Sequence, residues 1–239
     1  MKPSYEDSNR LSISQAPLVV AIDGPAAAGK STTAYLLASR LGILYMNTGA
    51  MYRGLTWKAL RDGVDLKRED VLGELAEKTD IQLSCDGSVD ARVHVDGQDV
   101  SSSIRCSQVE RFVSIVSKVA RVRTAMVRMQ RNMARENPAV VEGRDIGTVV
   151  FPDASVKVFL TASFEVRVDR RWKQLLKANA GYDRQQIQQE LEQRDRLDTE
   201  RAVAPLKRAP DAYLLENTDL SIEQTVDAVL NLVRQQAKT

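Results

Sequence analysis

Residues 24–31 combine glycine, lysine and serine in a spacing that is suited to binding phosphate. They read GPAAAGKS, which fits the pattern G-x-x-x-x-G-K-[ST]. Glycines let the backbone wrap closely around phosphate oxygens and turn its N–H groups toward them. Lys30 can reach the β- and γ-phosphates of ATP, and the Ser31 hydroxyl is suited to ligate Mg²⁺. The residues expected to contact ATP are Gly24, Pro25, Ala26, Ala27, Ala28, Gly29, Lys30, Ser31 and Thr32.

The segments on either side of this loop support the phosphate-binding interpretation. Residues 18–22 form a short apolar and β-branched run, as in a buried parallel strand. Residues 32–41 carry leucines at helical spacing. A glycine-rich turn that has no ligand is the alternative, but the order of strand, loop and helix favours a P-loop, whose helix adds a positive N-terminal end.

Arginines follow the ends of other expected strands and indicate a second anion site. Arg53 comes after the short run 44–46, and the pair Arg144 and Asp145 comes directly after the run 139–141. Ligands of open α/β sheets bind outside the carboxyl ends of the strands. Transfer of a phosphoryl group between two anions requires several fixed cations. If the acceptor is itself a phosphate, no general base is required, and His94, the only histidine, is expected to be a solvated strand residue.

The remaining pattern predicts an α/β fold with a parallel sheet flanked by helices, because strand-like and helix-like segments alternate. Expected strands lie at 44–46, 139–141, 156–160 and 213–215, and expected helices at 48–61, 107–135, 164–178, 184–201 and 222–236. The alternating residues 81–85 and 93–95, with turn signals at 86–87 and 96–97, predict a small antiparallel-sheet insertion.

Composition excludes several functional classes. The 239 residues carry 34 lysines and arginines against 32 aspartates and glutamates, which argues against a dedicated nucleic-acid binder. Cys85 and Cys106 form no disulfide framework, so a reducing cytoplasm is expected. No apolar run approaches the roughly 20 residues of a membrane span. Residues 1–15 are polar and are expected to form a mobile N-terminal tail.

Four segments together resemble the bacterial cytidylate kinase family, whose members make CDP from CMP and ATP. They are residues 22–31, the run NTGAMYR at 47–53, the run EGRDIGTVVFPDA at 142–154 and the run RAVAPL at 201–206. The resemblance implies a single P-loop NTPase kinase domain at 16–239. Its core would cover about 16–62 and 138–239, a CMP-binding region with the inserted sheet about 63–137, and a helical lid about 168–184.

The resemblance also implies a role for each residue that matches a family motif. The residues implied for CMP or dCMP are Thr48, Arg53 and Arg144 for the phosphate, Ser114, Arg123 and Asp145 for cytosine, Arg194 and Asp198 for the ribose, and Arg201 for base or phosphate. Lys30, Arg144, Arg170 and Arg171 are the implied catalytic cations, with Mg²⁺ bound through Ser31. A monomer with no nucleic-acid or membrane partner is implied. Asn47 stands where the family usually has aspartate.

Other interpretations fit parts of the sequence. The arginines and aspartates do not by themselves name the base, so a kinase for UMP, AMP or shikimate is an alternative. A guanine-reading N-K-x-D motif is absent, which disfavours a nucleotide-driven switch. The basic stretch 111–135 would suit a nucleic-acid binder, or only a solvated helix face. Arg194 and Asp198 could be a surface helix pair.

Overall fold

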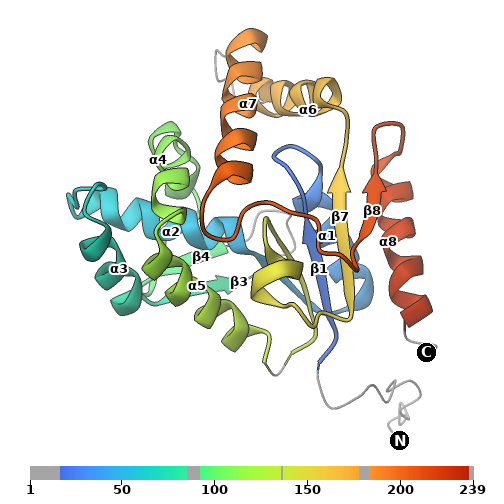
Figure 1. Ribbon diagram of the computed structural model, residues 1–239, viewed down its shortest axis with the longest axis horizontal. Helices are drawn as coiled ribbons and strands as arrows, with labels where there is room; N and C mark the ends of the chain where they lie inside the picture. The colour runs from blue at the N-terminus through green and yellow to red at the C-terminus, as the bar shows by residue number, and fades with distance from the viewer. Residues whose placement is uncertain (1–16, 85–91, 136, 178–182, 237–239) are drawn as a thin grey trace, which may run out of the picture.

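A five-stranded parallel sheet forms the centre of the computed structural model, which describes residues 17–84, 92–135, 137–177 and 183–236 (Figure 1). The order of its strands is β2 (Leu44–Asn47), β6 (Ala139–Gly143), β1 (Val19–Asp23), β7 (Val156–Thr161) and β8 (Tyr213–Glu216). β1 and β6 are buried along their whole length, as their apolar runs require. The α/β fold predicted from the sequence is confirmed.

Helices and loops cover both faces of this sheet. On one face, α1 (Lys30–Leu41) and α8 (Ile222–Gln236) pack Leu37 and Val229 against β-strand residues such as Ile22. On the other face, a short turn of π-helix (Ile146–Val150) packs against residues of β1 and β6. The sheet is therefore buried between two apolar layers, and only its ends can carry a polar site.

A second lobe lies beside the sheet and contains the predicted antiparallel insertion. It is coloured cyan to green in Figure 1. The three-stranded sheet has the order β3 (Ile81–Ser84), β4 (Arg92–Val95) and β5 (Gln98–Asp99). The predicted turn at 96–97 joins β4 to β5 with positive φ at both residues, whereas the turn predicted at 86–87 lies outside the described residues. The helices of this lobe are α2 (Thr48–Arg61), α3 (Glu69–Lys78), α4 (Ser107–Ser117) and α5 (Ala120–Met133), with a 3-10 turn at Ser103–Arg105.

Two helices extend beyond the carboxyl ends of the central strands. They are α6 (Phe164–Lys177) and α7 (Arg184–Glu200), drawn in gold and orange in Figure 1. The lid predicted at about 168–184 includes most of α6 and the first residue of α7, and its residues 178–182 lie outside the described part of the chain. The predicted tail at 1–15 also lies outside it. No helix among the described residues has the length and apolarity needed to cross a membrane.

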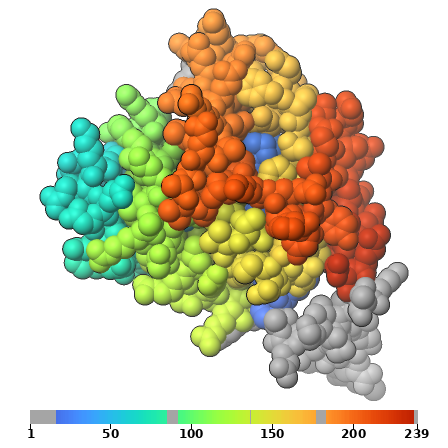
Figure 2. All heavy atoms as spheres, in the orientation of Figure 1, coloured from blue at the N-terminus to red at the C-terminus, as the bar shows by residue number. Residues whose placement is uncertain are grey.

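The strand register brings the carboxyl ends of three strands to one edge of the sheet. Ile22 of β1 and Asn47 of β2 are both in register with Glu142 of β6. The phosphate-binding loop and the segments that carry Arg53 and Arg144 therefore begin side by side. In the space-filling view, blue atoms from the early part of the chain are seen in a hollow framed by the gold, orange and red segments (Figure 2).

Candidate active site

The predicted P-loop runs between β1 and α1, and its glycines are required by the backbone. A Cβ atom on Gly24 would lie 2.0 Å from the carbonyl oxygen of Leu160, so no larger residue fits. Gly29 has φ +91, which also favours glycine. Lys30 is buried, and its Nζ donates to the carbonyl oxygen of Pro25 at 2.6 Å. Burial, followed by the nearby Arg144 guanidinium, lowers the pKa of Lys30 to about 7.

Side chains from α6, α7 and the segment after β8 hold the outside of this loop. Arg167 donates to the carbonyl oxygen of Ala26 at 3.1 Å and pairs with Asp195 at 2.6 Å. Arg170 donates to the side-chain and backbone oxygens of Asn217, both at 2.9 Å. Asn217 in turn donates to the carbonyl oxygen of Ala28 at 3.1 Å. The helices beyond the sheet are thus tied directly to the loop.

A polar chain beside Ser31 is the place where a metal ion could bind. Tyr45 donates to Glu142 Oε1 at 2.7 Å and accepts from Asn47 Nδ2 at 3.3 Å. Burial and then the neighbouring Glu142 carboxylate raise the pKa of the Tyr45 hydroxyl. The same hydroxyl has a hydrogen bond with the side chain of Ser31, so Tyr45 links Ser31 to Glu142. The Asn47 Oδ1 accepts from the N–H of Ala50 at 2.9 Å and caps α2. Asparagine therefore preserves the helix cap that an aspartate would provide here.

The turn that carries Arg144 and Asp145 is held by a carboxylate from the strand that leads into the P-loop. The two oxygens of Asp23 accept from the N–H groups of Ile146 and Gly147, each at 2.7 Å. Asp23 is buried, and burial raises its pKa to about 6 despite these two bonds, which lower it. Asp23 was not predicted as a site residue, although a charged residue at the end of an apolar strand was a signal that could have identified it.

Two of the three residues predicted to read cytosine, Arg123 and Asp145, lie with Arg201 in a buried ion-pair cluster. Asp145 pairs with Arg123 through one oxygen and with Arg201, at 3.3 Å, through the other. The guanidinium of Arg123 lies 5.5 Å from the centroid of the Tyr52 ring. Burial, followed by the nearby Arg123, lowers the pKa of Arg201. Arg123 is only 3% exposed, so it does not belong to a solvated helix face.

The residues predicted to bind phosphate and ribose form further pairs near this cluster. Arg144 pairs with Asp198 at 2.7 Å, which shows that Asp198 is not part of a surface pair with Arg194. Although burial opposes it, the Arg144 and Arg194 guanidinium groups hold the pKa of Asp198 below its usual value. Thr48 donates to the carbonyl oxygen of Glu142 at 2.8 Å.

Arg53 and Arg194 share a partner that was not predicted, Glu110 of α4. Glu110 lies 3.8 Å from Arg53 Nε and 3.1 Å from Arg194 Nη1.

Two predicted site residues have fewer contacts with the rest of the site. Arg171 donates to Gln174 on its own helix at 3.0 Å, and Ser114 lies half-buried on α4. Among the hydrogen bonds and ion pairs of the described residues, neither is joined to another predicted site residue.

Comparison with known proteins identifies the family of this chain. The family model described as cytidylate kinase matches residues 20–235. The chain belongs to the cytidylate kinase family. It is 45% identical to a cytidylate kinase from Shouchella clausii (strain KSM-K16) over 92% of this chain and 97% of the relative. It is 43% identical to the cytidylate kinase of Bacillus subtilis (strain 168), over 92% of this chain and 98% of that protein. A cytidylate kinase from Bacillus cereus (strain B4264) is 47% identical over 90% of this chain and 95% of its own length.

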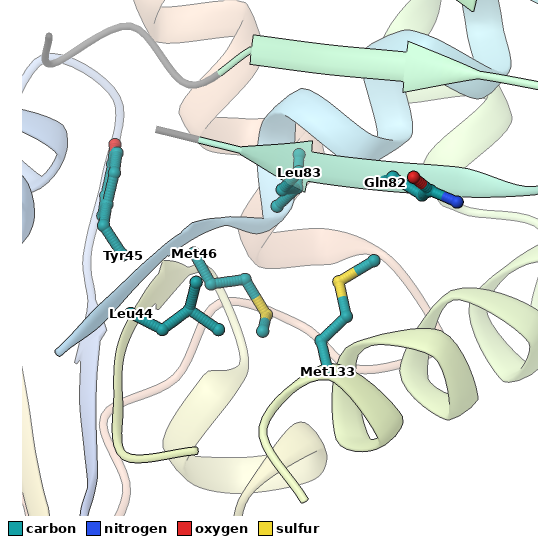
Figure 3. Close-up of a pocket in the computed structure, with 6 residues that line it drawn as sticks. All are labelled: Leu44, Tyr45, Met46, Gln82, Leu83 and Met133. Carbon is teal, nitrogen blue, oxygen red and sulfur yellow. The ribbon is translucent and has the colours of Figure 1, made fainter. Parts of the chain in front are cut away.

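An apolar pocket of about 290 Å³ lies between β2 and β3, and its lining includes none of the predicted site residues. Figure 3 shows Leu44, Met46 and Met133 directed toward it and the Tyr45 hydroxyl directed away. Both strands are at the edge of their sheets. The pocket contains no charged side chain, so it does not resemble a phosphate site.

The titration of Asp23 gives a test of the carboxylate that holds the Arg144–Asp145 turn. Its pKa is about 6 in the folded chain against an ordinary 3.8, so the folded state binds this proton more tightly. The contribution of Asp23 to the free energy of unfolding should therefore rise as the pH falls from about 7 to about 4. An Asp23→Asn variant lacks this titration. Urea unfolding of both proteins across that range should show the wild type gaining stability relative to the variant at low pH. A difference that stays constant with pH would contradict the assigned environment of Asp23.

Proposed function

We propose that this chain transfers the γ-phosphoryl group of ATP to CMP, giving ADP and CDP, and that it also accepts dCMP. The observation that carries the proposal is the buried Arg123–Asp145–Arg201 cluster beside Tyr52. It adjoins Arg144, whose charge acts on Lys30 of the P-loop. Paired donor and acceptor groups of this kind suit a polar base, whereas the neighbouring arginines suit the phosphate of the nucleotide. Membership of the cytidylate kinase family supports the same substrate.

ATP would bind on the P-loop, with Mg²⁺ held beside Ser31. Mg²⁺ in phosphate-binding sites takes one or two protein oxygens, with phosphate oxygens and waters completing its shell. The Ser31 hydroxyl and the buried Glu142 carboxylate, which are linked through Tyr45, fit that preference. Bound Mg²⁺ would supply charge that neutralises the transferring phosphate. Lys30 would bring a further cation, and the phosphate charge would favour its protonated form.

The acceptor phosphate would lie against Arg53, Arg144 and Thr48. Each of these follows the end of β2 or β6, at the edge where the P-loop also begins. A phosphate oxygen is already ionised near neutral pH, so the acceptor needs no general base. Catalysis then rests on alignment of the two phosphates and on fixed positive charge from Lys30 and Arg144.

The base and sugar would be read by groups that now pair with one another. Cytosine has a donor at N4 and acceptors at N3 and O2, which match the carboxylate of Asp145 and the guanidinium of Arg123. Ser114 and Arg201 would complete this side. Asp198 would accept a hydrogen bond from a ribose hydroxyl, and Arg194 would hold that region. Movement of α6 and α7 toward the acceptor would exclude water that could otherwise hydrolyse ATP.

The direct test is ADP release with several acceptors in a coupled assay. CMP and dCMP should support turnover, and CMP should exceed UMP by at least about a hundredfold in kcat/KM, because the wrong base leaves buried polar groups unpaired. AMP and shikimate should be poor acceptors. Equal use of UMP and CMP would refute the assignment of the acceptor.

Lys30→Ala tests the phosphate-binding loop. The ammonium should bind charge that develops during transfer, so turnover should fall by on the order of 10³ or more while the protein stays folded. Steady-state kinetics and a thermal melt measure the two properties. A folded variant with near wild-type turnover would remove the P-loop from the mechanism.

Arg170→Met and Arg171→Met distinguish an arginine that stabilises the fold from one that contacts the transferring phosphate. Arg170 is bound by Asn217, so its loss should lower both Tm and turnover. Among the hydrogen bonds of the described residues, the Arg171 side chain has one partner, Gln174 of its own helix. Arg171→Met should therefore lower kcat on the order of 10²-fold with the Tm and the CMP affinity little changed. If Arg171→Met changed only the CMP affinity, Arg171 would belong to the acceptor site instead.

Asp145→Asn tests the reading of the base. An amide can donate to the O4 of uracil, whereas it serves N4 of cytosine less well. The ratio of kcat/KM for CMP over UMP should therefore shrink, chiefly through loss of activity on CMP. The measurement compares both acceptors with wild type and variant. An unchanged ratio would exclude Asp145 from base recognition.

A further inference from the structure

The Glu110 carboxylate lies among arginines, in a position where an anionic ligand could bind. Glu110 lies in the first turn of α4, and its carboxylate reaches Arg53 of α2 and Arg194 of α7. Arg171 of α6 is also close enough to act on it. Although burial opposes the effect, Arg194, Arg53 and Arg171 together hold the pKa of Glu110 below its usual value. The carboxylate is therefore a fixed negative charge among arginines from three different helices.

The contact with Arg53 leaves this guanidinium incompletely satisfied. The distance of 3.8 Å from Arg53 Nε to Glu110 Oε1 gives an ion pair but not a hydrogen bond. The Nε of Arg53 is buried and has no hydrogen-bond partner among the described residues. A buried donor of this kind costs free energy until an acceptor reaches it. The side chain is thus ready for an oxygen that lies closer than the oxygen of Glu110.

We infer that Glu110 fills the anion position of the acceptor phosphate in the free protein and thereby sets the affinity for phosphate-bearing acceptors. The inference rests on the proposed function, because Arg53 and Arg194 are there assigned to the CMP phosphate and ribose. In the free protein the carboxylate offsets the repulsion between the two arginines. When CMP binds, its phosphate and the carboxylate compete for Arg53 and repel each other, so Glu110 must turn away.

A supporting role for Glu110 predicts the opposite result. If the carboxylate only held Arg53 and Arg194 in the geometry that CMP needs, its removal would weaken CMP binding. If it is a competitor, its removal strengthens CMP binding. The sign of the change therefore separates the two roles.

The test is calorimetric binding of CMP and of cytidine to the full chain. Glu110→Gln should lower the Kd for CMP by about tenfold, since one like-charge contact is removed. Cytidine lacks the phosphate, so its Kd should not change. Glu77→Gln is the matched control, because it removes the same charge from an exposed residue of the same lobe. Among the described residues, Glu77 forms an ion pair only with Arg121. Glu77→Gln should change neither value.

Glu110→Asp keeps the experiment decisive if the glutamine variant folds poorly. The shorter side chain retains its charge but withdraws from the arginines, so the Kd for CMP should fall by less than in Glu110→Gln. Weaker or unchanged CMP binding in folded variants, or an equal change for cytidine, overturns the role of Glu110. Wild-type protein that binds ATP but not CMP overturns the proposed function itself, which is a separate outcome.

Discussion

Repulsion among arginines is the constraint on which the site of this protein depends. A site for two phosphate groups requires several cations within a few ångströms, and these destabilise one another when no anion is bound. In the structure, carboxylates of the protein offset this repulsion. Asp145 pairs with Arg123 and Arg201, Asp198 with Arg144, and Glu110 with Arg53 and Arg194. The hydrogen-bonded pairs of Arg123 with Asp145 and of Arg144 with Asp198 also hold these two guanidinium groups in one orientation, which is a form of preorganisation for phosphoryl transfer.

The parallel sheet meets a second requirement, because it keeps the proposed ATP and acceptor sites at a fixed distance from each other. The P-loop follows β1, and the Arg144–Asp145 turn follows the neighbouring strand β6. Asp23 adds a direct link, because the residue that precedes the loop holds the N–H groups of Ile146 and Gly147. Arg167, Arg170 and Asn217 connect the same loop to α6 and to the segment after β8. These contacts couple the outer helices directly to the phosphate-binding loop, so a movement of the helices can shift the loop while the sheet stays in place.

Local patterns in the sequence predicted much of this arrangement. Apolar runs and helical spacing identified β1, β6 and α1, and the glycine spacing identified the loop between them, because these features are set by residues close in the chain. The partners of the charged residues could not be obtained in this way. Asp23 and Ile146 are 123 positions apart, and Arg53 meets Glu110 only after α2 and α4 have packed together. Glu110 lies one helical turn before Ser114, and this shared face was the only local hint of its place.

A structure with CMP and an unreactive ATP analogue bound would show directly which groups contact each part of the acceptor. In that complex we expect the cytosine to contact Asp145 and Arg123. We expect the CMP phosphate to lie between Arg53 and Arg144, in line with the terminal phosphate on the P-loop. We also expect the arginines to exchange their internal carboxylates for ligand atoms, so that Asp198 turns to the ribose and Glu110 leaves Arg53. Bound CMP that leaves these ion pairs intact, or that lies away from the Arg144–Asp145 turn, would contradict the account.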